Sequence, residues 1–185
     1  MNWKNTTDRY GSLSITMHWL MLALLVAVYA CIELRGIYPK GSAAHDAMKT
    51  WHFMLGLSVF ALVLLRLAIR WFSGPAPGIQ PPLPRWQHRL AALMHLALYA
   101  FLIVMPLLGW LTLSAKGRVI PLFGLELPPL LDTDKGLAHA LEDIHETICT
   151  IGYYLIGLHA VAALYHQYFA RDNMLRRMLP ARRRT

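Results

Sequence analysis

Four long apolar runs constrain the fold of this chain more than any other feature. They cover about residues 13–32, 51–71, 90–113 and 144–169, with polar or proline-rich segments between them. A helix rises about 1.5 Å per residue, so each run can cross a hydrocarbon core about 30 Å thick. Inside a bilayer the backbone must satisfy its own hydrogen bonds, which a helix does within one segment. The sequence therefore predicts an all-α integral membrane protein, a four-helix bundle formed by a single domain over residues 1–185.

Composition agrees with a membrane protein and argues against other classes. Hydrophobic residues make up 56% of the chain and charged residues 15%, and the mean hydropathy is +0.39. The formal net charge is +8, but the basic residues flank the apolar runs instead of forming a patch with aromatic residues, so nucleic acid is not an expected partner. Cys31 and Cys149 form no CxxC motif, which argues against a metal–thiolate centre, and two cysteines are too few for a disulfide framework. Two free thiols are favoured over one bridge.

The distribution of basic residues predicts the orientation in the membrane. Of the 18 Lys and Arg residues, twelve lie near the N-terminus, at the end of the second apolar run, in the loop that follows it or in the basic tail 170–185. The opposite side carries most of the Asp and Glu residues. By the positive-inside rule, both termini are expected to be cytoplasmic.

Four histidines sort by depth into two pairs. His145 and His159 are fourteen residues apart, which is about 21 Å along a helix and nearly the same helix face. His52 begins the second run on the periplasmic side, at the depth of His145, and His18 lies near the cytoplasmic end of the first run, at the depth of His159. Ionisable groups at such depths are costly and usually functional.

Two imidazoles at one depth on facing helices indicate axial ligation of b-type haem. Neutral imidazole nitrogens bind iron, and the absence of a CxxCH motif excludes covalent attachment. We therefore predict two non-covalent bis-histidine haems, one held by His52 and His145 and one by His18 and His159. His95 is the rival to His18 as a ligand. Such a pair of haems would carry electrons across the bilayer.

Several neighbouring residues fit this interpretation. Gly56 and Gly152 would allow a haem to approach the backbone closely. Arg66 is fourteen residues after His52 and is predicted to pair with a haem propionate at the cytoplasmic side. The remaining candidates, assigned by position, are Arg9 and Arg70 on the cytoplasmic side, Arg35, Lys40 and Lys49 on the periplasmic side, and His166 near a quinone or proton path. His45, His88 and His139 are expected to be solvated.

The chain resembles the bacterial cytochrome b561 family over nearly its whole length. The resemblance rests on the order and spacing of MHWL at His18, ELRGIYP, LLRLAIR, IHET at His145, and IGLHAVAALYHQYFARDNMLRRMLP. It implies a four-helix di-haem cytochrome b of the bacterial inner membrane, with the ligands His18, His52, His145 and His159. The chain is most similar to the superoxide oxidase type, which implies oxidation of superoxide to O2 at the periplasmic side and reduction of ubiquinone with cytoplasmic protons.

Substrate contacts follow less directly from the sequence. Arg35, Lys40 and Lys49 could steer superoxide, a small anion, toward the periplasmic haem. The loop that supplies part of the family's quinone site shows the weakest match, so no quinone residue is transferred from it.

Two other functions stay open at this level. One is a cytochrome b subunit that exchanges electrons with a partner dehydrogenase or hydrogenase. The other is a non-haem metal or proton-coupled transporter that uses membrane histidines. An absorption spectrum separates the second from a haem protein, and co-purification of an iron–sulfur subunit would identify the first.

Overall fold

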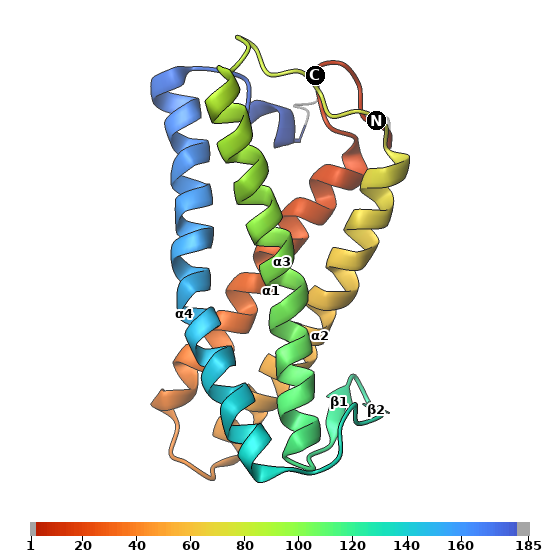
Figure 1. The fold of residues 1–185 in the computed structure, drawn as a ribbon, viewed down its shortest axis with the longest axis vertical. Coiled ribbons are helices and arrows are strands. Elements are labelled where there is room, and N and C mark those ends of the chain that lie inside the picture. The colour runs from red at the N-terminus through yellow and green to blue at the C-terminus, as the bar shows by residue number, and fades with distance from the viewer. Residues whose placement is uncertain (1–2, 181–185) are drawn as a thin grey trace.

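The computed structural model describes residues 3–180. Four long helices dominate it and run alternately up and down (Figure 1). All four are long and apolar enough to cross a membrane, which confirms the predicted all-α membrane fold. Their bounds are Ser12–Leu34 for α1, Ala43–Phe72 for α2, Arg85–Ala115 for α3 and Lys135–Tyr165 for α4. Shorter elements are the 3-10 turns Arg35–Ile37 and Arg176–Met178, the strands β1 (Ile120–Leu122) and β2 (Leu125–Leu127), and a π-helical turn over His166–Ala170.

Two of the helices begin well before the apolar runs that predicted them. Ser42 caps α2 by accepting a hydrogen bond from the His45 amide at 3.3 Å, well ahead of Trp51 in the sequence. Asp134 caps α4 in the same way, accepting from the Leu137 amide at 3.0 Å. A side-chain oxygen at this position satisfies an amide that has no partner within the helix. The polar first turns therefore extend the helices beyond the apolar spans.

The two ends of the bundle carry different structures. At one end, which we call the terminal end, the Asn5 amide donates to the Ser73 carbonyl at 3.1 Å and the Tyr10 amide to the Arg177 carbonyl at 3.3 Å. The N-terminal segment, the end of α2 and the C-terminal segment thus lie together there (Figure 1). The opposite end, the hairpin end, carries Arg35–Ile37 and the strands. Residues 181–185 of the predicted basic tail lie outside the described residues.

The strands form a small antiparallel hairpin that the sequence did not predict. Ile120 pairs with Leu127, and Leu122 with Leu125. Phe123 and Gly124 both have positive φ, of 48° and 87°, as a tight two-residue hairpin turn requires. Ile120 is buried against Leu57 and Leu113. The segment expected as an irregular loop therefore packs against α2 and α3.

Packing inside the bundle is thin because most of its apolar side chains face outward. The central cluster consists of Met21, Val59, Val63, Phe101, Leu102 and Met105. Side chains directed toward lipid need no cover from protein, so a membrane bundle tolerates a small core. The closely packed helix pairs are α1 with α2, α2 with α3 and α3 with α4. Within residues 3–180, the backbone of α4 stays further from those of α1 and α2, and the contacts between them are made by side chains.

Candidate haem-binding sites

Histidine side chains bridge the helices whose backbones stand apart. Near the hairpin end, the rings of His52 on α2 and His145 on α4 have centroids 6.4 Å apart at an interplanar angle of 74°. Near the terminal end, the rings of His18 on α1 and His159 on α4 have centroids 6.4 Å apart at 68°. The structure therefore brings together both pairs that depth alone had suggested, and α4 contributes to each.

This separation fits a metal ion between two imidazoles. A metal–imidazole bond is about 2 Å long, so an iron ion bound by two ring nitrogens would place the centroids roughly 6 Å apart. Two rings in direct packing contact can come closer, as His95 and His159 do at 5.5 Å. His95 is also exposed, whereas His18 is half-buried. The geometry thus favours His18 over His95 as the partner of His159.

The pair at the hairpin end has its ring orientation set by backbone. His52 Nδ1 lies 3.0 Å from the carbonyl oxygen of Val28 on α1. A proton on Nδ1 donated to this carbonyl leaves Nε2 unprotonated, which is the arrangement that metal-bound histidines show. His145 Nδ1 is buried, and within the described part of the chain it has no hydrogen-bond partner. Buried polar atoms are normally paired, so an orphaned imidazole nitrogen is consistent with a missing ligand or water.

Glycine allows α3 to approach this pair, at a position that sequence reasoning missed. A Cβ built on Gly109 would lie 3.5 Å from His145 Cε1. Gly109 lies in the apolar run 90–113, where hydropathy alone does not show which residues face a ligand. Gly109 could have been identified in the sequence as a glycine of a neighbouring span at the same depth as the candidate ligand His145. By contrast, a Cβ on the predicted residue Gly56 would meet nothing within 4 Å, so space lies beside α2 one turn after His52.

The pair at the terminal end is surrounded by side chains that carry or can accept charge. An Arg66 Nη2–H donates to His18 Nδ1 over 3.2 Å. Arg66 and Arg70 both lie 5.9 Å from the centre of the Tyr99 ring. His95 Nδ1 lies 2.6 Å from the Ala91 carbonyl of its own helix. The sequence placed Arg66 at this depth, and the structure brings it into direct contact with the histidine.

Gly152, midway between the pairs, is packed by protein. It is buried, and a Cβ there would lie 2.5 Å from Phe101 Cε2 and 2.6 Å from the Tyr29 hydroxyl oxygen. The Tyr29 hydroxyl donates to the Cys149 carbonyl at 3.1 Å. In the structure the close approach at Gly152 is therefore made by side chains of α1 and α3. Cys31 and Cys149 are both free, as the sequence favoured.

The three basic residues predicted to steer an anion all lie at the hairpin end. Arg35 is half-buried in the 3-10 turn that packs against α2, and Lys40 is exposed in the loop that follows. Lys49 Nζ lies 3.7 Å from Asp46 Oδ1, which neutralises part of its charge. Arg35 and Lys40 thus offer the less compensated charges.

Other candidates occupy different surroundings from those expected. Arg9, proposed for a propionate, donates to the Leu179 carbonyl at 2.5 Å, and thus contacts the C-terminal segment. His166 Nδ1 lies 2.5 Å from Oδ2 of the buried Asp172. The prediction that His45 is solvated is wrong: it is 6% exposed, because α2 already begins at Ala43 and turns this residue inward beside Asp46. His88 and His139 are exposed as expected.

Clusters for a non-haem metal are not seen in the part of the chain that the structure describes. Among residues 3–180, no group of three or more His, Cys, Asp or Glu side chains is placed to hold a metal ion. The histidines occur as pairs, which suits a metal that brings its own equatorial ligands, as haem iron does.

Comparison with known proteins identifies the family. The family model described as prokaryotic cytochrome b561 matches residues 9–181. The chain is 38% identical over 176 residues to "Cytochrome b561 homolog 1" of Escherichia coli K12, covering 95% of this chain and 99% of the relative. It is 35% identical over 175 residues to "Probable superoxide oxidase CybB" of Yersinia pestis, covering 95% and 98%, and 31% identical over 186 residues to "Cytochrome b561 homolog 2" of E. coli K12, covering 97% and 95%. The chain is therefore a bacterial membrane protein of the prokaryotic cytochrome b561 family, whose members bind b-type haem and transfer electrons.

Proposed function

We propose that this single domain holds two b-type haems, one between His52 and His145 and one between His18 and His159. The observation that carries the proposal is that both pairs have the same 6.4 Å separation between ring centroids. They stand at opposite ends of the bundle and share only α4. Bound haem would supply a one-electron carrier near each face of the membrane.

The protein's own groups would act differently at the two sites. The Val28 carbonyl holds the Nδ1 proton of His52 and so directs Nε2 toward the site. Arg66 donates to His18 Nδ1, a contact in which the neutral imidazole carries its proton on Nε2. Ligation through Nε2 would release this contact and leave the guanidinium available for a propionate carboxylate, which it can bind through two parallel hydrogen bonds.

We further propose that the protein oxidises superoxide at the hairpin end and reduces ubiquinone at the terminal end. Two superoxide anions would each lose one electron to become O2, and one ubiquinone would take up both electrons and two protons to become ubiquinol. The name of the Y. pestis relative supports this substrate. The positive-inside rule favours a cytoplasmic terminal end, and therefore proton uptake from the cytoplasm and a place in the inner membrane.

Electrostatic attraction at the hairpin end supports an anionic substrate. Of the three candidate cations at that end, Lys49 is paired with Asp46, whereas Arg35 and Lys40 are not. Arg35 also lies on the turn packed against α2, the helix that carries His52. Charges near a site raise the encounter rate of a small anion, and salt screens them. His166 and Arg70, at the terminal end, remain positional candidates for ubiquinone.

One experiment tests the proposal in two stages. The purified protein should contain two haems per chain, measured as pyridine haemochrome, with an α-band characteristic of bis-imidazole b-type haem on reduction. In proteoliposomes, a superoxide source should then drive ubiquinol formation, and superoxide dismutase should suppress it. One haem per chain would contradict the pairing, whereas two haems without superoxide-dependent reduction would contradict the substrate alone.

The alternatives give different results in the same assays. A cytochrome b subunit of a larger complex would show the haem spectrum but co-purify with an iron–sulfur protein and depend on it for electrons. A non-haem metal or proton-coupled transporter would show no haem spectrum.

A further inference from the structure

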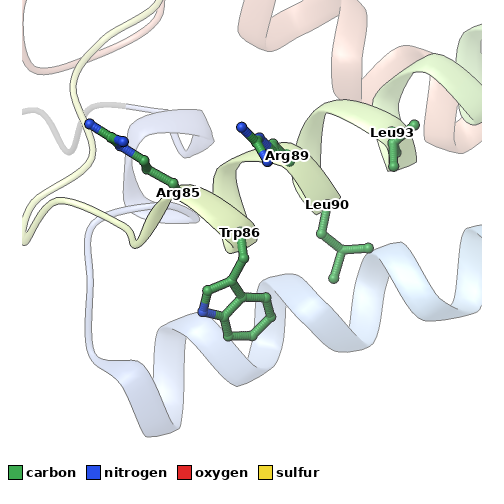
Figure 2. A pocket seen from close by; sticks show the side chains of 5 residues that line it. All are labelled: Arg85, Trp86, Arg89, Leu90 and Leu93. Carbon is green, nitrogen blue, oxygen red and sulfur yellow. The ribbon is translucent and has the colours of Figure 1, made fainter.

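An open groove lies at the start of α3, at the terminal end. It has a volume of about 670 Å³ and is lined by Arg85, Trp86, Arg89, Leu90 and Leu93. Figure 2 shows the indole of Trp86 and the side chain of Leu90 on the side of α3 that faces α4, and the two arginine head groups directed away from α4. The groove therefore joins a cationic border to an apolar wall.

The helical repeat explains how one short segment makes both parts. Arg85, Arg89 and Leu93 follow each other at four-residue spacing along one ridge of α3, and Trp86 and Leu90 form the adjacent ridge. Trp86 is 64% exposed, Leu90 58% and Leu93 62%. Leu93 is about 6 Å deeper along the helix than Arg89, since each residue rises about 1.5 Å. Positive charge thus lies at the membrane edge, and exposed apolar surface lies toward the membrane interior.

The arginines of this groove are uncompensated by the protein. Among residues 3–180, neither Arg85 nor Arg89 forms an ion pair or a side-chain hydrogen bond. Basic residues elsewhere do find partners: Lys116 Nζ lies 2.6 Å from Glu142 Oε1. The first turn of α3 contains no acidic residue, and Pro84 provides no side-chain cap, so the free amides of the helix start add to the positive potential.

We propose that this groove binds an anionic phospholipid of the surrounding leaflet, with Arg85 and Arg89 on the phosphate and an acyl chain along Leu90 and Leu93. Guanidinium groups bind phosphate through paired, charge-assisted hydrogen bonds. Trp86 would lie at the boundary between head group and chain, where its ring is amphipathic. A quinone head group is uncharged and would leave both arginines unpaired, and a free phosphate would leave the exposed apolar wall uncovered. The proposal does not depend on the bound haems.

Native mass spectrometry of the full-length protein, transferred from nanodiscs of mixed phosphatidylglycerol and phosphatidylcholine, tests the proposal. We expect the wild type to retain phosphatidylglycerol selectively. A hydrogen bond to a charged group contributes about tenfold or more to binding, so the double variant Arg85→Gln/Arg89→Gln should lose at least about tenfold in selectivity. The matched control Arg171→Gln/Arg176→Gln removes two exposed charges at the same end and should keep the selectivity of the wild type. An equal loss of selectivity in both double variants would show that only the net charge matters and would contradict a specific site.

Two further arms identify the ligand. Trp86→Ala should weaken retention of phosphatidylglycerol. Trp71→Ala should not, although Trp71, on α2 at the same end, is even more exposed, at 85% against 64% for Trp86. Inorganic phosphate should fail to displace the lipid. Full displacement by inorganic phosphate would show a simple anion site, and displacement by ubiquinone would show a quinone site; either result overturns a phospholipid site. The haem spectrum or circular dichroism of each variant confirms that it folds.

Discussion

The two histidine pairs have the same ring separation but differ in what holds the rings. At the hairpin end, the orientation of His52 is set by a backbone carbonyl of another helix, and His145 stands against the bare backbone of Gly109. At the terminal end, His18 contacts a long charged side chain, Arg66, and His159 has a third histidine, His95, beside it. The first pair is thus oriented mainly by backbone and the second mainly by side chains.

The difference bears on how each site would respond to change. A backbone carbonyl keeps its position as long as the helices pack, so the first pair depends on the fold as a whole. A flexible arginine can exchange one partner for another, so the second pair can rearrange when a ligand binds. We therefore expect point substitutions to separate the two pairs, with the terminal end more sensitive to single charged residues.

Removal of a ligand should have the largest effect. His145→Ala and His52→Ala should each lower the haem content from two per chain to one and remove the site at the hairpin end. His159→Ala and His18→Ala should remove the site at the terminal end instead. Redox titration monitored by absorption identifies which component is lost. If His145→Ala and His159→Ala abolish the same component, the two pairs are not independent sites.

Whether His18 or His95 is the partner of His159 can be tested by haem content at the terminal end. His18→Ala should lose one haem, whereas His95→Ala should retain both, because the 5.5 Å separation of the His95 and His159 rings is too short for an iron between them. Haem stoichiometry measures both variants directly. The reverse result would replace α1 by α3 as the source of the ligand.

Arg66 tests the role of side chains at this end. Hydrogen bonds to a charged group such as a propionate contribute about 10- to 100-fold in affinity, so Arg66→Gln should weaken haem retention at the terminal end by a factor in this range. The site at the hairpin end should be unaffected. Arg66→Lys should fall between the two, since it restores the charge without the paired hydrogen bonds. Haem transfer to apomyoglobin gives the retention of each site, and equal loss from both sites would contradict the assignment of Arg66.

Two glycines contrast packing by protein with space for a ligand. Gly152→Ala should destabilise the fold by about 1–3 kcal/mol, because the new methyl group overlaps the Phe101 ring and the Tyr29 hydroxyl. Gly56→Ala meets nothing in the structure and lies inside α2, so it should keep or slightly raise the stability of the haem-free protein while weakening haem binding at the hairpin end. Unfolding of haem-free and haem-loaded protein in detergent separates these effects. A stable Gly152→Ala variant would contradict the packing.

Charge at the hairpin end should have the smallest effect. Arg35→Gln and Lys40→Gln should each slow superoxide-dependent ubiquinone reduction several-fold at low salt, with a smaller difference at high salt. Lys49→Gln should have less effect, since Asp46 already offsets its charge at 3.7 Å. Stopped-flow rates across a salt series measure this. A wild-type rate in all three variants would contradict electrostatic steering of superoxide.

Much of the architecture could be predicted because lipid simplifies the sequence signal. Apolar runs of this length have one stable form in a bilayer, so the number, order and type of the helices followed from hydropathy. The depth of each histidine followed from the fixed rise of a helix, which is why counting residues along the chain was enough to match His52 with His145 and His18 with His159. The helix starts at Ala43 and Lys135 were missed because Ser42 and Asp134 act as caps outside the apolar runs.

By itself, the sequence determined the class, the helices and the depths of the four histidines. The tertiary structure decided which side chains meet: Val28 with His52, Arg66 with His18, Gly109 with His145, and Phe101 with Gly152. Depth is a property of one helix and can be counted along it. Rotation about the helix axis and the spacing between helices depend on how all four pack, and these contacts set the 6.4 Å separation in each pair.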